Sequence, residues 1–229
     1  MKPFTFSISD ALRDSWKVFK RHVWFFLVMA FVSIVLGYSG NGDRMPLLIA
    51  ILASIASVLW SIMWLKVSLA AARGDESKLS FAKLEQMVPR LREVFMIIGI
   101  GLLGGLLILC GLILLVIPGL YVLVRLSFAS LVYLDRHDGI RASLRYSWNI
   151  TKPALWTVAL TLIVVVALYI AGIAFLGVGL LIAYPLAMML TARLYVALSA
   201  HHAQEPVVTP ATEVPTDVPE AEKVEPETV

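Results

Sequence analysis

The sequence predicts an all-α polytopic membrane protein with six transmembrane helices, arranged as three tandem repeats of an interfacial helix and a helical hairpin. Three observations carry this prediction: 59 % of the 229 residues are hydrophobic, only 15 % are charged, and the mean hydropathy is +0.85. This is more apolar side chain than one water-soluble core of this size can bury. A soluble globular domain is therefore excluded, and we expect most of the chain to lie in lipid.

Six apolar runs are expected to cross the bilayer, each near the span of about 20 residues that a hydrocarbon core of about 30 Å requires. In chain order they are Val23 to Gly37, Met45 to Ala72, Val94 to Ile117, Gly119 to Leu134, Ala154 to Leu176 and Gly177 to Ala200. The first and the fourth are short. Because proline cannot continue a helix and glycine accepts turn dihedrals, we expect chain reversals at Ile117-Pro118-Gly119 and at Leu176 to Gly179.

Basic residues outside these spans fall very unevenly between the two sets of loops. Fourteen lie on one side: Lys2, Arg13, Lys17, Lys20, Arg21, Arg73, Lys78, Lys83, Arg90, Arg92, Arg136, Arg141, Arg145 and Lys152. The other side has only Arg44, so both termini are predicted to be cytoplasmic. A cleaved signal peptide is the competing interpretation of residues 1–40, but its charged leader would be about 22 residues long and contain Asp10 and Asp14.

The chain contains an internal repeat at an offset of 132 residues. Six residues in thirteen positions are identical: Leu12, Arg13, Ser15, Trp16, Lys20 and Trp24 align with Leu144, Arg145, Ser147, Trp148, Lys152 and Trp156. Each copy predicts a short amphipathic helix that leads into an apolar span. A degenerate third copy fits Leu84, Met87, Leu91 and Val94, so three units are expected.

The second, fourth and sixth spans each carry one basic residue followed four positions later by alanine. These residues, Lys66, Arg125 and Arg193, are the only charges expected inside the membrane, and we take them as candidate intramembrane ligand or lipid contacts. An ionisable side chain near the bilayer centre costs at least about 2.5 kcal/mol. The alternative is that the side chains snorkel to the inner headgroups, which suits Lys66 and Arg193 best because they lie nearer the cytoplasmic ends.

Arg125 lies about 15 Å along the helix from Asp135, which places it near the bilayer centre. We therefore expect its side chain to have a partner inside the bundle. No acidic residue lies within any predicted span. The predicted partners are therefore carbonyls, hydroxyls such as those of Ser127 and Thr161, water, or an anionic ligand. Every Asp and Glu up to position 200 is near a Lys or Arg in a short amphipathic segment, which is typical of a solvated helix face.

Four tryptophans are predicted to anchor the protein at the membrane interface. Trp24 and Trp156 follow the basic segments and fit an aromatic belt, and Trp16 and Trp148 lie on the amphipathic helices. Two others, Trp60 and Trp64, lie deeper and are expected to pack against other helices.

No catalytic, cofactor-binding or metal-binding residue is predicted. Gly99-Ile-Gly101-Leu-Leu-Gly104 matches a dinucleotide fingerprint as a string, but it lies within a span and follows no strand. These glycines, with Gly105, instead predict a small-residue face that another helix approaches closely.

The polar residues support the same expectation. The single cysteine, Cys110, excludes a disulfide framework, and His201 and His202 are expected to be a solvated helix end. No nucleophile and base, carboxylate pair or clustered ligand set appears in any loop, so the chain is not expected to be an enzyme.

Two regions are expected: a transmembrane domain over 1–200 and a disordered, cytoplasmic, Pro-rich tail over 201–229. The tail has five prolines, seven acidic residues, one lysine and no aromatic residue, which gives it a net charge of −6. Such a composition buries too little apolar surface to fold.

The stretch from Ile117 to Ala129, followed by Asp135 and by Gly139 to Trp148, resembles the signature of a broad bacterial group. This group comprises the membrane domain of glycerophosphodiester phosphodiesterases and related uncharacterised integral membrane proteins. Residues 12–20 and 185–195 are similar too, so the likeness covers most of residues 8–200. In the enzymes of the group the chemistry belongs to a separate soluble barrel domain, so the resemblance transfers no catalytic residue. It implies a bacterial inner membrane and a stand-alone membrane module.

The predicted function is that of a non-enzymatic inner-membrane protein that interacts with anionic lipid or with a membrane protein partner, and not with nucleic acid. The alternative is a small transporter or channel whose path is lined by Lys66, Arg125 and Arg193. A membrane subunit that serves a separately encoded enzyme is a third hypothesis.

Overall fold

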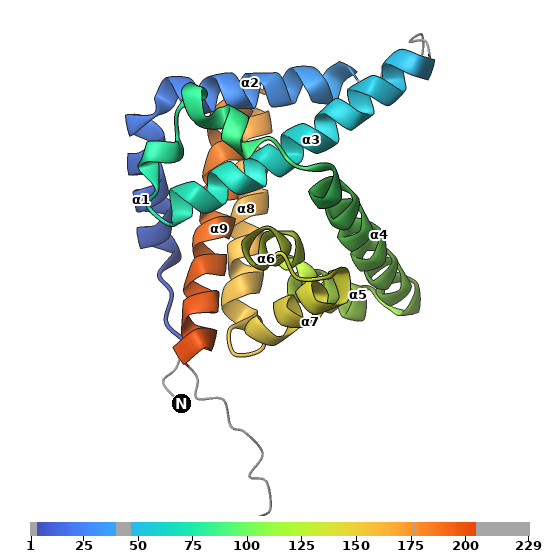
Figure 1. Cartoon of the computed structure of the whole chain (residues 1–229). Helices are drawn as coiled ribbons and strands as arrows, with labels where there is room; N and C mark the ends of the chain where they lie inside the picture. Colours follow the sequence, from blue (N-terminus) through green and yellow to red (C-terminus); the bar gives the residue numbers. More distant parts are fainter. Residues whose placement is uncertain (1–3, 40–46, 176, 205–229) are drawn as a thin grey trace, which may run out of the picture.

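The computed structural model describes residues 4–39, 47–175 and 177–204, and over these residues the chain is helical without any β-strand (Figure 1). The α-helices are α1 (Ile8–Arg21), α2 (Val23–Ser39), α3 (Leu47–Ala72), α4 (Leu91–Leu114), α5 (Val116–Leu126), α6 (Ala129–Arg136), α7 (Ile140–Ile150), α8 (Leu155–Ala174) and α9 (Leu180–Gln204). Two 3₁₀ helices, η1 (Glu76–Lys78) and η2 (Phe81–Met87), join α3 to α4. The predicted all-α class is confirmed.

Five helical segments of the described residues are long and apolar enough to cross a membrane. They are Leu48–Ala72, Leu91–Leu114, Val116–Arg136, Leu155–Ala174 and Leu180–Gln204, and the third of them combines α5 and α6. A sixth span exists if α1 and α2 are counted together, although a 96° bend separates them. Helix α2 alone has only 17 residues. These apolar helices are those of a multi-pass membrane protein.

Helix α9 lies at the centre of the structure. It packs against α1, α2, α3 and α8, and α1 and α8 flank it in Figure 1. Its side chains are among the most buried of the described residues, with Leu190 and Tyr195 both 0 % exposed. The second group of helices, α4 to α7, is joined to the first through contacts of α6 with α3 and of α5 with α8.

The hairpin between α4 and α5 reverses three residues earlier than predicted. The chain becomes extended at Leu115, with φ −168° and ψ 150°, and Pro118 lies in the first turn of α5. This position tolerates proline because the first N–H groups of a helix have no intrahelical acceptor, so the missing donor costs nothing. The other reversal is confirmed: α8 ends at Ala174, and Gly177 has a left-handed φ of 78°.

The predicted small-residue face of α4 is confirmed for two of its four glycines. An added Cβ at Gly101 or Gly105 would meet nothing within 4 Å, whereas one at Gly99 would lie 2.5 Å from the Ile140 side chain. The closest helix approach is instead further along α4, where Gly111 lies against the backbone of Gly119 in α5. Gly104 is buried, and a Cβ there would lie 3.8 Å from the Leu144 side chain. Of the four predicted glycines, Gly99 and Gly104 therefore face α7, whereas Gly101 and Gly105 face no other helix among the described residues.

The predicted amphipathic helices are α1 and α7, but the third copy is not one helix. Leu84 and Met87 lie in η2, while Leu91 and Val94 lie in α4, and Val88 to Arg90 between them is non-helical. Pro89 explains the break, because proline disfavours a helical conformation in the residue before it.

The predicted boundary of the tail is four residues too early. Helix α9 continues through His201 and His202 to Gln204, so these residues extend the last helix. Residues 205–229, on which the rest of the tail prediction falls, and Arg44 lie outside the described residues.

Replacing Gly111 with alanine should lower the midpoint of thermal unfolding, because the new Cβ would lie 2.8 Å from the Gly119 Cα. Overpacking of this kind costs about 1–3 kcal/mol. Gly105→Ala is the matched control on the same helix, since nothing lies within 4 Å of its Cβ. Circular dichroism of the purified chain in a neutral detergent measures both midpoints. Equal midpoints would show that α4 and α5 are not in backbone contact at Gly111.

Candidate functional site

The surroundings of Lys66 form the most polar region beside the apolar helices. Lys66 Nζ lies 2.6 Å from Glu93 Oε2, and their side chains are 21 % and 10 % exposed. The same Glu93 oxygen accepts the backbone N–H of Arg90 at 3.2 Å, and His137 Nε2 lies 3.6 Å from the other oxygen. Glu93 thus joins the first turn of α4 to α3 and to the residue after α6.

This contact corrects the expectation that every acidic residue lies on a solvated face. Glu93 is buried, because it caps the start of α4 and neutralises Lys66 at the same time. Its position three residues after Arg90 is the capping position in which a carboxylate bonds back to the first backbone N–H. The spacing of Arg90 and Glu93 is visible in the sequence, whereas the pairing of Glu93 with Lys66 on α3 is not.

Two adjoining cavities open around this ion pair, and we call them together the basic cleft. They measure about 280 and 320 Å³ and share Lys66, Gln86, Glu93 and His137 in their linings. The basic side chains that line one or both cavities come from α3, the loop with η1 and η2, and α4: Lys66, Arg73, Lys78, Lys83, Arg90 and Arg92. Except for Lys66, the sequence indicated these residues only as topology signals.

Arg125 has the predicted partner inside the bundle. Its guanidinium donates to the Trp148 carbonyl at 3.3 Å and to the Tyr121 hydroxyl at 2.5 Å. It also lies over the Tyr121 and Trp148 rings, 4.8 and 5.4 Å from their centroids. The predicted carbonyl is confirmed, but Ser127 and Thr161 are not its partners, because each hydroxyl donates to a carbonyl of its own helix. Arg125 therefore fastens α7 to α5.

Arg193 has a third environment. It is half-buried on α9, and its Nε is buried without a hydrogen-bond partner among the described residues. Its charge acts on Asp14 of α1, whose pKa is lowered first by the hydrogen bond from Lys17 and to a smaller extent by Arg193. Lys66, Arg125 and Arg193 therefore have three different sets of neighbours, and neither cavity of the basic cleft borders Arg125 or Arg193.

The tryptophans divide into exposed and packed ones. Trp24 and Trp156 are 79 % and 81 % exposed, as a lipid-facing belt requires. Trp16 is 39 % exposed, while Trp148 is half-buried against Arg125 and Tyr121.

Trp60 and Trp64 pack within the helices, as their deeper position suggested. Both indole N–H groups donate to the Ser33 hydroxyl, each at 2.8 Å, and Ser33 donates in turn to the Met29 carbonyl at 2.9 Å. One hydroxyl of α2 thereby holds two tryptophans of α3.

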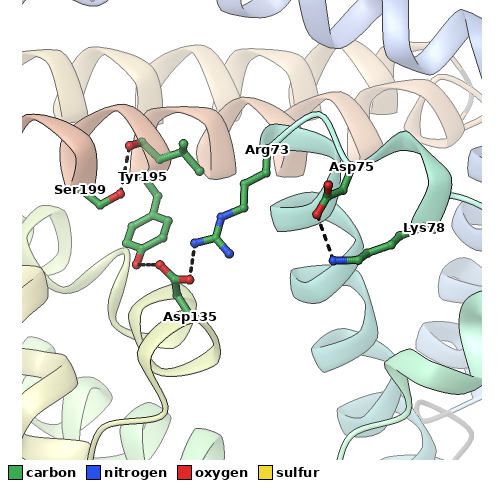
Figure 2. A network of polar contacts seen from close by, with 7 residues as sticks. Arg73, Asp75, Lys78, Asp135, Tyr195 and Ser199 are labelled. Carbon is green, nitrogen blue, oxygen red and sulfur yellow. Dashed lines mark hydrogen bonds and ion pairs between the residues drawn. The ribbon is translucent and has the colours of Figure 1, made fainter.

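Asp135, which the sequence marked only as part of the family resemblance, is a further polar group of the structure. Its carboxylate at the end of α6 accepts the Tyr195 hydroxyl of α9 at 2.8 Å and forms an ion pair with Arg73, just after α3 (Figure 2). Lys78 pairs with Asp75 at 2.9 Å in the adjacent loop. The ends of α3 and α6 and the interior of α9 therefore meet at one carboxylate.

The fold and these contacts define a class: a polytopic helical membrane protein with a basic cleft at the ends of its helices. In the described residues, no three His, Cys, Asp or Glu side chains are grouped so that they could hold a metal ion. Comparison with protein-family models, with curated proteins and with solved structures gave no match to this chain.

Asp135→Ala should lower the thermal unfolding midpoint of the protein more than Asp138→Ala. The first substitution leaves the buried Tyr195 hydroxyl without its acceptor, which costs about 1–3 kcal/mol. The second removes an exposed pair of Asp138 with Arg136, worth about 0–1 kcal/mol. Both midpoints are measured in the same detergent. A larger loss for Asp138→Ala would contradict the central position of Asp135.

Proposed function

We propose that this chain is a non-enzymatic integral membrane protein that binds anionic phospholipid through the basic amphipathic helices α1 and α7. The observation that carries the proposal is the paired exposure of Trp24 and Trp156, which are 79 % and 81 % exposed and directly follow these two helices. Tryptophan is enriched at membrane interfaces because its ring is apolar and its N–H is polar. Each exposed ring is therefore available to lipid beside its amphipathic helix.

The exposed faces of α1 and α7 also support binding to anionic lipid. In α1 the residues Ala11, Ser15, Val18 and Phe19 are buried, whereas Arg13, Lys17 and Lys20 are exposed. In α7 the residues Ser143, Leu144, Ser147 and Ile150 are buried, whereas Arg141 and Arg145 are exposed. A Lys or Arg near an anionic membrane surface contributes about 1 kcal/mol to binding.

The helix boundaries support the proposed repeat. Helices α1 and α7 begin at residues 8 and 140, and α2 and α8 begin at 23 and 155, which is an offset of 132 in both cases. Helices α3 and α9 begin at 47 and 180. On this proposal α4 and the α5–α6 segment are the middle unit, whose amphipathic entry has been reduced to η2.

The proposed location is the bacterial inner membrane, with both termini in the cytoplasm. The Phe4 ring lies 5.4 Å from the His201 ring, so the beginning of the described chain and the end of α9 are on the same side of the molecule, as an even number of spans requires. The fourteen-to-one distribution of basic residues gives that side its orientation. The resemblance to the bacterial membrane domain supports the choice of membrane.

A transporter path lined by Lys66, Arg125 and Arg193 is the less favoured function. Lys66 is paired with Glu93, and Arg125 is enclosed by Tyr121 and Trp148. Charges that are engaged separately in this way do not form one continuous path.

Phosphatidylglycerol should raise the thermal unfolding midpoint of the protein more than phosphatidylcholine does. Exchanging Arg13, Lys17 and Lys20 together for glutamine should remove much of this difference, because each charge contributes about 1 kcal/mol near an anionic surface. The control exchanges Arg13 for Lys and the two lysines for Arg, which keeps the charge. High salt should weaken the effect through screening. A lipid effect that survives in the glutamine variant would contradict the proposed role of α1.

Reporter fusions test the topology. An enzyme that is active only outside the cytoplasm should give no signal when fused after Gln204 and a strong signal when inserted between residues 40 and 46. The expected pattern follows from the distribution of basic residues. The reverse pattern would place the basic residues outside and would overturn the orientation.

A further inference from the structure

We propose that the basic cleft binds the phosphate group of an anionic phospholipid at a discrete site, separate from α1 and α7. The inference deepens the proposed function and rests on it for the choice of an anionic lipid. The site lies where α3, η2, α4 and the end of α6 meet, and its two cavities of about 280 and 320 Å³ adjoin at Lys66. Each is close to the lower end of the range for ligand pockets, about 300–1,000 Å³.

The charges of the cleft do not balance. Three of its basic side chains are neutralised by carboxylates: Lys66 by Glu93, Arg73 by Asp135, and Lys78 by Asp75. The other three, Lys83, Arg90 and Arg92, have no carboxylate within ion-pair distance among the described residues. The cleft therefore carries about three uncompensated positive charges, which favour an anion.

The types of side chain suit a phosphate. Arg90 and Arg92 both line the larger cavity, and an arginine guanidinium presents a planar set of donors that can bond two phosphate oxygens at once. Lys83 lines the smaller cavity, which it shares with Lys66, and supplies a compact charge there. The site also lies at the N-terminal end of the 24-residue α4, where the helix dipole adds positive potential.

Glu93 does not oppose an anion at this place. It is buried, and its oxygens are already engaged by Lys66, by the Arg90 backbone N–H and, at 3.6 Å, by His137. Its negative charge is therefore compensated by its own neighbours. The unpaired cations lie around it, and the Arg90 and Arg92 residues are exposed to an approaching ligand.

The apolar surroundings favour a lipid as the source of the phosphate. Val88 lines the larger cavity and is 55 % exposed. The first two turns of α4 continue this surface, with Leu91 76 % and Phe95 72 % exposed. A free phosphate ion gains nothing from such side chains, whereas acyl chains lying along α4 would cover them.

The test measures binding of single lipids to the full chain in a neutral detergent by native mass spectrometry. Short-chain phosphatidylglycerol is titrated against the wild type and against the double variant Arg90→Gln with Arg92→Gln. We expect the tightest lipid adduct of the wild type to be saturable, and its Kd to be at least tenfold weaker in the double variant. The matched control is Arg136→Gln with Lys152→Gln, which removes two exposed cations that lie outside the cleft and outside α1 and α7, and it should change this Kd less than twofold.

Further measurements distinguish a lipid headgroup from a free phosphate ion and a lost binding site from a misfolded variant. Phosphatidylcholine should compete poorly, and inorganic phosphate should displace the lipid only in large excess; equal binding of inorganic phosphate would overturn the assignment to a lipid. Lys83→Gln is the second cleft variant if the arginine pair fails to fold, and it should also weaken the Kd. Equal losses in the cleft variant and in the Arg136 and Lys152 control, or no loss in either cleft variant, would overturn the site. The lipid effect on the α1 glutamine variant tests the proposed function independently.

Discussion

The meeting of three long helical segments at the Asp135 carboxylate is the contact on which the arrangement of the helices depends. Asp135 ends α6, Arg73 follows α3, and Tyr195 belongs to the central helix α9. Apolar side chains gain little by leaving lipid for another apolar surface, so packing and polar contacts must hold membrane helices together. A carboxylate that binds Arg73 after α3 and Tyr195 within α9 holds these two helices and α6 in one relative position along their axes.

The same principle explains why the buried charges are tolerated. Lys66 and Arg125 each have a polar partner on a segment that follows their own span in the chain. Glu93 in the first turn of α4 pairs with Lys66, and the Trp148 carbonyl of α7 accepts from Arg125. The short amphipathic and capping segments therefore do more than lie at the interface. They carry the partners that lower the cost of placing a cation among apolar helices.

Much of the fold could be predicted from the sequence, because apolar runs of sufficient length specify membrane helices almost alone. The starts of α2 and α8 fall within a residue of the predicted spans. The reversal at Leu115 was misplaced because proline is tolerated in the first turn of a helix and so does not mark the break itself. The partner of Arg125 was correct in kind, since a carbonyl was expected, but Tyr121 one turn earlier on the same helix was missed.

The basic cleft was beyond sequence reasoning for a different reason. In the sequence, Lys83, Arg90 and Arg92 indicate only topology, because each is one of many basic residues in the loops. Only the tertiary contact of α3, α4 and α6 brings them beside Lys66. The unpaired state of these three cations depends equally on where Asp75, Glu93 and Asp135 lie. Long-range pairing of this kind leaves no periodic signal in a single sequence.

The Ser33 hydroxyl that holds Trp60 and Trp64 has an optical consequence. A hydroxyl offers one donor and two acceptor lone pairs, and here Met29 and the two indoles use all three. If either indole N–H takes another acceptor, its hydrogen bond between α3 and Ser33 of α2 is lost. Indole emission responds to hydrogen bonding at its N–H. The fluorescence of Trp60 and Trp64 therefore reports whether α2 and α3 are in contact at Ser33.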